Sequence, residues 1–239
     1  MKYIVKIELQ KNIIKLDYRR TFISFFKKAI SSYMEGVFFD EIYNSGAKKK
    51  ALVWSIRFAL PVFKGNVIEL SDNNIELTLK ISDNQTAVIY YSALLGMKNK
   101  EFKISPDNIM ILKSIHLVRE IEIENDIAVF KVLSPICIRQ HNKELNKDWY
   151  INVEDESFPM EINRILKEEL PYKEKQVDEL MYNFDRMKMV LVQAFNLKIP
   201  ASIGEFTLKG DREILNHILK SGLGSRRNSG FGLVELKIN

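Results

Sequence analysis

Cysteine and histidine are scarce in this chain, which has one cysteine and three histidines among 239 residues. A single cysteine excludes an internal disulfide framework and a cysteine-cluster zinc site. Cys137 lies in an apolar strand pattern, where it is expected to act as a small buried hydrophobic residue. No group of Asp, Glu, His or Cys shows metal-ligand spacing, so the sequence predicts neither a metal nor another cofactor.

Long apolar runs are also missing. No stretch approaches the ~20 residues that span a bilayer, and the N-terminus lacks the layout of a signal peptide. We therefore expect a cytoplasmic protein that does not contact membranes. The hydrophobic fraction of 46%, with 10% aromatic residues, is enough for buried cores and excludes a disordered chain.

Positive charge is concentrated near the N-terminus. Residues 1–50 carry eleven Lys or Arg and five Asp or Glu, whereas residues 150–185 carry four and ten. A basic segment suits a polyanion, because each neutralised phosphate releases condensed counterions. The acidic segment is expected to face away from such a ligand. Solvated helix faces of both signs would give the same pattern.

The hydrophobic periodicity predicts two successive domains. In residues 1–122 a strand and a helix capped by Asp17 are followed by two strands, a helix and a strand, the ferredoxin-like order β-α-β-β-α-β. The predicted elements span 2–10, 18–34, 52–63 with 67–70, 75–81, 85–98 and 109–118. A similar order in residues 123–239 predicts a second such domain, with elements at 127–138, 155–170, 187–200, 202–208, 211–220 and 231–238. Residues 174–185 are expected to be helical or irregular. The predicted fold class is α+β, with tandem ferredoxin-like domains.

A glycine-rich loop spans residues 222–232, with the sequence GLGSRRNSGFG, and holds four of the ten glycines of the chain. Glycine tolerates positive φ and close approach of another backbone, so the cluster indicates an unusual local path. The side chains between the glycines are donors suited to phosphate oxygens. The order helix, glycine loop, strand is the reverse of the mononucleotide-binding fingerprints, so a mononucleotide site is not expected. A purely structural turn is the alternative.

The G-Φ-G-x5-G-Φ-G spacing followed by a short strand resembles the C-terminal glycine-rich loop of the RAMP proteins of CRISPR systems. Residues 130–139, which contain Ser134-Pro135-Ile136, are similar to the strand that opens the second domain of the family members that cut precursor CRISPR RNA, and residues 206–211 also fit. The resemblance implies the RAMP fold and a metal-independent endoribonuclease. Such an enzyme cleaves within repeats by 2′-hydroxyl attack, leaving a 5′-hydroxyl and a 2′,3′-cyclic or 3′-phosphate. CRISPR repeat RNA is the implied partner; effector-complex subunits and a homodimer stay open.

In that family the catalytic residues come from the first helix, the loop after it and the entry to the second strand. Lys27 or Lys28 matches the helix position, and Lys50 matches the strand-entry lysine. No histidine lies between Met34 and Lys50, which departs from the frequent family pattern. We therefore predict that Lys50, with Lys27 or Lys28, stabilises the phosphorane, and that Tyr43 is the proton donor or acceptor. A solvated charge run is the alternative for the lysines that end at Lys50.

RNA binding is predicted mainly at the glycine loop, where backbone contacts position RNA without reading its sequence. His141, which follows Arg139 closely, is predicted as an alternative base, whereas the other two histidines are expected to be structural or exposed. The predicted RNA-binding residues are Gly222, Gly224, Ser225, Arg226, Arg227, Asn228, Gly230 and Gly232, and secondarily Arg19, Arg20 and Arg139.

Three other functions remain open from the sequence. The first is a RAMP protein that binds repeat RNA but cleaves it weakly or not at all, which the missing loop histidine permits. The second is a structural subunit that coats guide RNA, although no segment is long enough for the thumb-like insertion common in such subunits. The third, a protein-interaction domain, leaves the glycine loop and its arginines unexplained.

Overall fold

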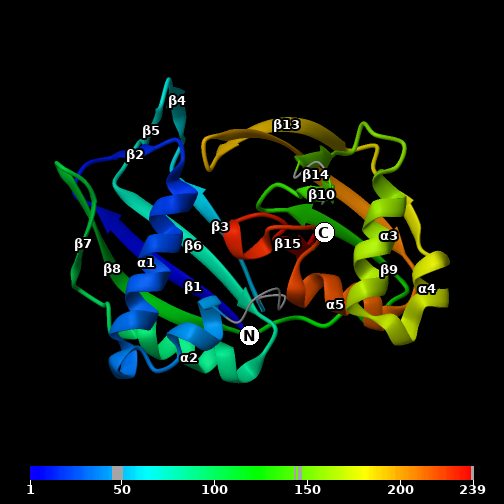
Figure 1. Cartoon of the computed structure of the whole chain (residues 1–239), viewed down its shortest axis with the longest axis horizontal. Coiled ribbons are helices and arrows are strands. Elements are labelled where there is room, and N and C mark those ends of the chain that lie inside the picture. The colour runs from blue at the N-terminus through cyan, green and yellow to red at the C-terminus, as the bar shows by residue number, and fades with distance from the viewer. Residues whose placement is uncertain (45–50, 143, 145–146, 238–239) are drawn as a thin grey trace. The chain divides into compact units, whose positions relative to one another are not determined.

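The computed structural model describes residues 1–44, 51–142, 144 and 147–237 (Figure 1). The chain forms two compact units, Met1–Glu120 with Gln193–Leu197, and Ile121–Val192 with Lys198–Asn239. Residues 193–197, which the sequence placed in the second domain, group with the first unit. No helix in the described ranges has the length and apolar character needed to cross a bilayer.

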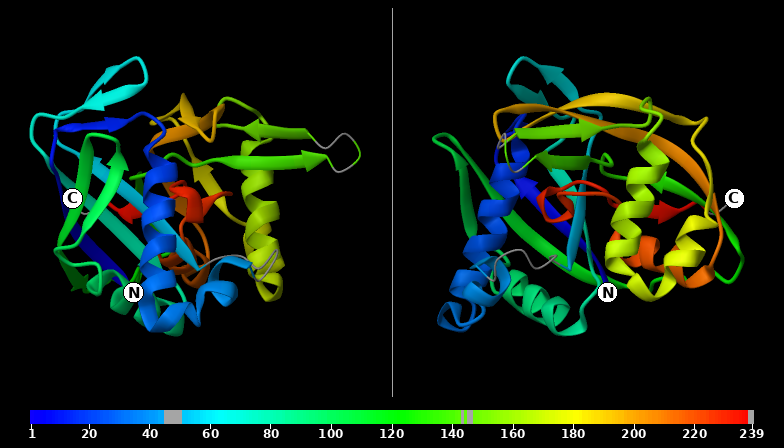
Figure 2. Two further views of the ribbon diagram at one scale, coloured as in Figure 1. Left: turned by 60° about the vertical axis from the view of Figure 1, so that its left-hand side comes forward. Right: turned by 45° about the vertical axis from the view of Figure 1, so that its right-hand side comes forward.

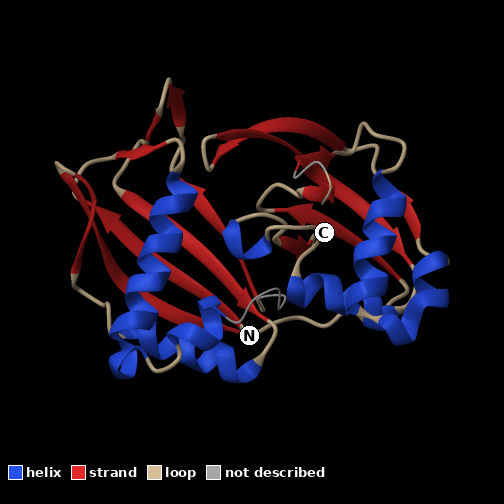
Figure 3. Ribbon diagram, viewed as in Figure 1, coloured by secondary structure: helices blue, strands red, loops and turns tan. Residues whose placement is uncertain are grey.

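The first unit is a five-stranded antiparallel sheet with two helices on one face (Figure 3). The strand order β3-β6-β1-β8-β7 contains the four ferredoxin-like strands and adds β7 at one edge, and β2, β5 and β4 form a second, small sheet. The elements are β1 (Lys2–Leu9), β2 (Ile13–Lys15), α1 (Tyr18–Ser32), β3 (Leu52–Phe58), β4 (Val62–Lys64), β5 (Val67–Glu69), β6 (Asn74–Ile81), α2 (Asn84–Leu95), β7 (Glu101–Ser105) and β8 (Asn108–Val118), with short helical turns η1 (Tyr33–Gly36) and η2 (Asp40–Asn44) after α1.

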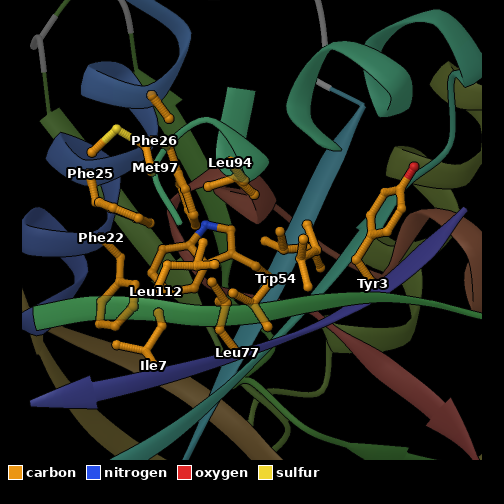
Figure 4. Packing of buried hydrophobic residues seen from close by; sticks show 14 of the residues in the cluster. Tyr3, Ile7, Phe22, Phe25, Phe26, Trp54, Leu77, Leu94, Met97 and Leu112 are labelled. Atoms are coloured by element: carbon orange, nitrogen blue, oxygen red, sulfur yellow. The ribbon is translucent and has the colours of Figure 1, made fainter. Parts of the chain in front are cut away.

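Apolar residues that alternate along the strands, and apolar residues at helical spacing in α1, form the core of the first unit. The odd-numbered residues of β1 are buried, as a period of two predicts for a strand with one covered face. From α1, Phe22 and Phe26 reach the indole of Trp54 on β3, with ring centroids 5.8 and 5.5 Å from it (Figure 4). All three side chains are at most 1% exposed, so this contact fixes α1 on the sheet.

The second unit repeats the order with additions. Its sheet order β12-β14-β9-β15, with β13 paired to β14, again corresponds to the ferredoxin-like arrangement. A separate two-stranded hairpin, β10–β11, extends from this unit (Figure 2). The elements are β9 (Ile127–Val132), β10 (Ile138–Asn142), β11 (Lys147–Ile151), α3 (Phe158–Glu169), η3 (Pro171–Lys173), α4 (Glu174–Asp178), β12 (Met181–Asn183), β13 (Met187–Ala194), β14 (Leu197–Lys209), α5 (Arg212–Ser221), η4 (Arg227–Ser229) and β15 (Val234–Leu236).

The predicted class, tandem ferredoxin-like domains, is confirmed by the two sheet orders. The sequence missed β2, β7, β12 and the β10–β11 hairpin, and it read β3 and β4 as one strand. Strand β12 lies within residues 174–185, which were expected to be helical or irregular. These strands are short or lie at edges, and the hairpin carries few buried residues. They therefore lack the alternation of apolar and polar residues from which a strand can be predicted.

The two tryptophans of the chain offer a matched test of this packing. Trp54→Ala is expected to lower the free energy of unfolding by about 3–5 kcal/mol, because it leaves a cavity between α1 and the sheet. Trp149 is 41% exposed, so Trp149→Ala is the control and should change stability little. Urea unfolding of both variants measures the difference; equal losses would contradict the core assigned here.

Candidate nucleic-acid interface and catalytic residues

The glycine loop lies against the segment that contains Ser134-Pro135-Ile136, so the two motifs of the resemblance are in contact. The amide of Ser225 donates to the carbonyl of Cys137 at 2.6 Å, and the amide of Gly232 donates to the carbonyl of Pro135 at 2.9 Å. The amide of Leu233 donates to Ser134 Oγ at 2.9 Å. The segment at 134–137 therefore holds both ends of the loop.

Two glycines are required by close backbone approaches, one between the loop and the segment at 134–137 and one within the loop. A Cβ on Gly232 would lie 2.1 Å from the carbonyl oxygen of Leu223, and one on Gly224 would lie 2.7 Å from that of Cys137. Both residues also have positive φ, +74° and +89°, which disfavours any other residue. The unusual path predicted from the glycine cluster is present.

Arg227 holds the loop onto neighbouring helices. Its guanidinium pairs with the carboxylate of Glu169 through two nitrogens, Nη2–Oε1 at 2.6 Å and Nη1–Oε2 at 3.2 Å. Nη1 also donates to the carbonyls of Ser221 and Gly222 at the end of α5. The two side chains are only 12% and 6% exposed. This geometry opposes the predicted RNA-binding role of Arg227, because its donors are committed to protein acceptors.

Arg226 is directed to the β10–β11 hairpin. Its Nη2 donates to Tyr150 Oη at 2.7 Å and lies 3.3 Å from Asp148 Oδ2. Arg139 Nε lies 2.7 Å from the same carboxylate oxygen. We call Arg139, His141, Asp148, Tyr150 and Arg226 the hairpin cluster. Among these five residues, two guanidiniums share one carboxylate, so positive charge exceeds negative charge within the cluster.

Asp148 organises the hairpin cluster. The adjacent Arg139 guanidinium, and then the bond with His141, lower the pKa of this carboxyl to about 2, so it is ionised at neutral pH. His141 Nδ1 lies 2.8 Å from Asp148 Oδ1 and 3.3 Å from Arg139 Nη2. The shorter contact favours the tautomer in which Nδ1–H donates to the carboxylate. Nε2 is then the basic nitrogen, as the predicted alternative base requires.

In the first unit, Tyr43 and Lys27 lie together near the end of α1. Lys27 Nζ is 5.4 Å from the centre of the Tyr43 ring, and Tyr43 Oη is 3.1 Å from the hydroxyl of Tyr90 on α2. Burial raises the pKa of Tyr43 to about 12 and that of Tyr90 well above its usual value. Tyr43 therefore keeps its proton at neutral pH, which favours a donor over an acceptor.

The remaining predicted side chains divide by exposure. Lys28 is exposed, and Lys50 lies outside the described residues. Arg20 is exposed and pairs with Asp17 at 3.0 Å. Arg19 is only 3% exposed and lies over the ring of Tyr18, with its Cζ 4.8 Å from the ring centre. This burial leaves little of Arg19 accessible, which opposes the predicted RNA contact of Arg19.

The loop residues between the arginines and the glycines are half-buried. Ser225 Oγ accepts a hydrogen bond from the amide of Arg139 at 3.1 Å. Asn228 is also half-buried, and the amides of Ser229 and Gly230 bond back to Arg226 and Arg227 within the loop. Hydrogen bonds within the protein therefore fix the loop and occupy part of its donors. An RNA contact at Asn228 and at the glycine backbone stays a prediction.

Several partners in these sites were not predicted from sequence. Asp148 and Tyr150 lie on a hairpin that the sequence did not reveal. Glu169 is separated from Arg227 by 58 positions, and its carboxylate also contacts His217 Nε2 at 2.8 Å. Within the described residues, no group of three or more His, Cys, Asp or Glu could hold a metal ion.

Two ferredoxin-like units, with a glycine loop bonded to a Ser-Pro-Ile segment, define a RAMP-type protein. The chain is of the Cas6 type: residues 118–236 match the profile described as "CRISPR associated protein Cas6, C-terminal". This is a family of endoribonucleases that process CRISPR repeat RNA.

Known relatives agree with this assignment. The chain is 25% identical, over 67% of its length and 68% of the relative, to a Pyrococcus furiosus protein named as a CRISPR-associated endoribonuclease-like protein Cas6. A solved structure described as "An RAMP protein binding different RNA substrates" matches with a TM-score of 0.83 at 21% identity, covering 100% of both chains. A structure of the product of a Cas6-related gene from Pyrococcus furiosus has a TM-score of 0.82 at 20% identity, covering 99% of this chain and 98% of that one.

The ion pair of Arg227 is testable through stability. Arg227→Ala is expected to lower the free energy of unfolding by about 3–5 kcal/mol, because the buried carboxylate of Glu169 would lose the guanidinium that pairs with it. The salt dependence of RNA binding should not change. Lys237→Ala, which removes an exposed pair with Glu205 at 2.7 Å, is the control and should have little effect on unfolding. A stable Arg227→Ala protein with a flatter salt dependence would restore the RNA-binding role.

Proposed function

We propose that the chain cleaves precursor CRISPR RNA within its repeats, without a metal ion, by attack of a 2′-hydroxyl on the adjacent phosphate. The match of residues 118–236 to the Cas6 C-terminal family carries this proposal. The fold shared with an RNA-binding RAMP protein supports it. Repeat RNA is accordingly the proposed partner.

The reaction requires two proton transfers and charge stabilisation. The 2′-oxygen loses its proton and bonds to phosphorus, giving a phosphorane with added negative charge. The bond from phosphorus to the 5′-oxygen then breaks, and that oxygen accepts a proton. The products are a 2′,3′-cyclic phosphate and a 5′-hydroxyl. Preorganised cations and a proton donor placed at these atoms lower the barrier.

Tyr43 and Lys27 suit two of these roles. Tyr43 holds its proton at neutral pH, so it can protonate the departing 5′-oxygen. Lys27 Nζ, beside the Tyr43 ring, can face the phosphorane, and we assign the same role to Lys50. The position of Lys27 over the Tyr43 ring favours Lys27 over Lys28 as the candidate.

The hairpin cluster is the proposed contact for the RNA backbone. Its two guanidiniums share one carboxylate, that of Asp148. A phosphate can therefore bind them while Asp148 still holds both side chains in place. The side chains of Arg139 and Arg226 are 38% and 23% exposed, which leaves part of each accessible. Because phosphate contacts carry no base information, this surface would position the repeat rather than read it.

A protein that binds repeat RNA and cleaves it slowly is the second candidate. Residues 34–50 contain no histidine, and the raised pKa of Tyr43 leaves very little of it deprotonated, and so able to act as a base, at neutral pH. Residues 34–50 therefore supply no histidine to accept the proton of the 2′-hydroxyl. His141, supported by Asp148, is the alternative base in the second unit.

Single-turnover cleavage of candidate repeat RNAs in EDTA tests the main proposal. We expect cleavage with a 5′-hydroxyl on the downstream product. Tyr43→Phe, Lys27→Ala and Lys50→Ala should each slow the step by about 10²-fold without weakening binding, whereas Lys28→Ala is the matched control. Tight binding with no cut would select the second candidate. Loss of cutting in EDTA, restored by a divalent metal, would overturn the metal-independent route.

The pH dependence of the cleavage rate tests His141. If its imidazole is the base, the rate of the wild-type protein falls at acidic pH as the imidazole becomes protonated, and His141→Ala abolishes that acidic limb. His116→Ala, which alters an exposed histidine on β8, is the control. An identical profile for His141→Ala would exclude this histidine as the base.

A further inference from the structure

The first unit contains a cavity that the proposed function does not use. Its volume is about 370 Å³, within the range of small-ligand sites. Its lining includes residues from the start of α1, the end of that helix that lies near β2 (Figure 1). The side chains that matter here come from three elements and the junction before α1: Lys15 of β2, Asp17, Arg20 of α1, and Phe102 and Lys103 of β7.

Positive charge exceeds negative charge in this cavity. Its lining has three cations and one carboxylate, Asp17. Lys15 and Lys103 are exposed, and neither has an ion pair or side-chain hydrogen bond within the described part of the chain. Three convergent cations with one counter-ion favour an anionic ligand.

Arg20 is held in a way that leaves most of its donors available. Asp17 Oδ2 lies 3.0 Å from Nε of Arg20. The terminal nitrogens of that guanidinium have no hydrogen-bond partner in the described ranges. Asp17 occupies the N-cap position of α1 but makes no side-chain cap bond. Its described contact is therefore with Arg20, whose planar fork matches phosphate geometry.

An apolar wall completes the cavity. The half-buried ring of Phe102 packs edge-to-face on Phe25, with centroids 5.2 Å apart. A ring fixed in this way can support a nucleobase or a ribose, since bases stack on aromatic side chains whatever their sequence. Cations and an aromatic wall are together typical of sites for single-stranded nucleic acid.

The polar face of α1 connects this cavity to Tyr43. Arg20, Ser24 and Lys27 are exposed and follow the spacing i, i+4, i+7, so they lie on one face of the helix. Arg20 and Lys27 are seven residues apart, about 10 Å along the axis, which is the length of about three stacked nucleotides.

We propose that this cavity binds one nucleotide of a single-stranded RNA, with its phosphate on Arg20, Lys15 and Lys103 and its base or ribose on Phe102. Asp17 positions Arg20. The inference rests on the proposed function only in taking RNA as the ligand. It assigns the cavity to substrate binding a few nucleotides away from the bond that is cut.

Binding of a labelled ten-residue oligoadenylate, with methylated 2′-hydroxyls so that it cannot be cut, tests the cavity in the full chain. Arg20→Ala should raise Kd about tenfold and reduce the slope of log Kd against log salt by about 0.7. Lys64→Ala, which changes a paired lysine on β4, is the control. Phe102→Leu should also raise Kd about tenfold, with thermal unfolding measured to confirm its fold.

Asp17→Asn gives a test with the opposite sign. The amide oxygen can still accept from Arg20, while the negative charge is lost, so Kd should fall about threefold. Asp83→Asn at the start of α2, where the aspartate does cap the helix, should leave Kd unchanged. Weaker binding by Asp17→Asn, or unchanged Kd and salt slope for Arg20→Ala, would overturn the proposal. Cleavage of repeat RNA is measured on the same wild-type preparation. If it cleaves, the proposed function holds even where the cavity proposal fails.

Discussion

The close approach of the glycine loop to the segment at 134–137 determines the path of the chain between α5 and β15. The carbonyl oxygen of Cys137 occupies the space where a Cβ of Gly224 would lie, and the carbonyl oxygen of Leu223, within the loop, occupies that of Gly232. Backbone and serine hydrogen bonds then fix both ends of the loop. Because this packing sets the backbone of the loop, it also sets the directions of the two arginine side chains. Whether each arginine is accessible to RNA depends on that direction, because the two residues are of the same type.

Arg226 and Arg227 are neighbours with different electrostatic surroundings. Arg226 has φ +55°, a left-handed conformation that turns the chain sharply between them. Arg227 meets one carboxylate with a bidentate contact and is neutralised by it. Arg226 shares the carboxylate of Asp148 with a second guanidinium. The ratio of cations to carboxylates, more than the number of arginines, determines where positive charge remains for a phosphate. The same ratio distinguishes the cavity around Arg20.

The sequence predicted the element order because both sheets bury one face and both helix layers carry apolar stripes. It also contained a signal that Arg19 is buried, since Arg19 precedes Phe22 and Phe26 by three and seven residues on one face of α1. The partner of Arg227 could not be predicted, because Glu169 lies on α3 and only the tertiary fold brings it to the loop. The acidic segment was expected to face away from RNA. Its Glu169 instead neutralises an arginine assigned to RNA.

The described groups near α1 are better suited to stabilising charge than to removing a proton. Tyr43 and Tyr90 are both held in their neutral form by burial, and Lys27 supplies a cation beside them. A site of this kind acts on the phosphorane and on the leaving oxygen, where negative charge develops, and such electrostatic stabilisation is often the largest catalytic contribution. It gives little help with the 2′-hydroxyl proton. Alignment of the attacking oxygen with the phosphate then becomes the main requirement, because orientation alone can supply a large part of the rate enhancement. Contacts with the RNA backbone away from the cut, such as those proposed at Arg20 and at the hairpin cluster, would in this arrangement contribute to catalysis by holding the strand in line.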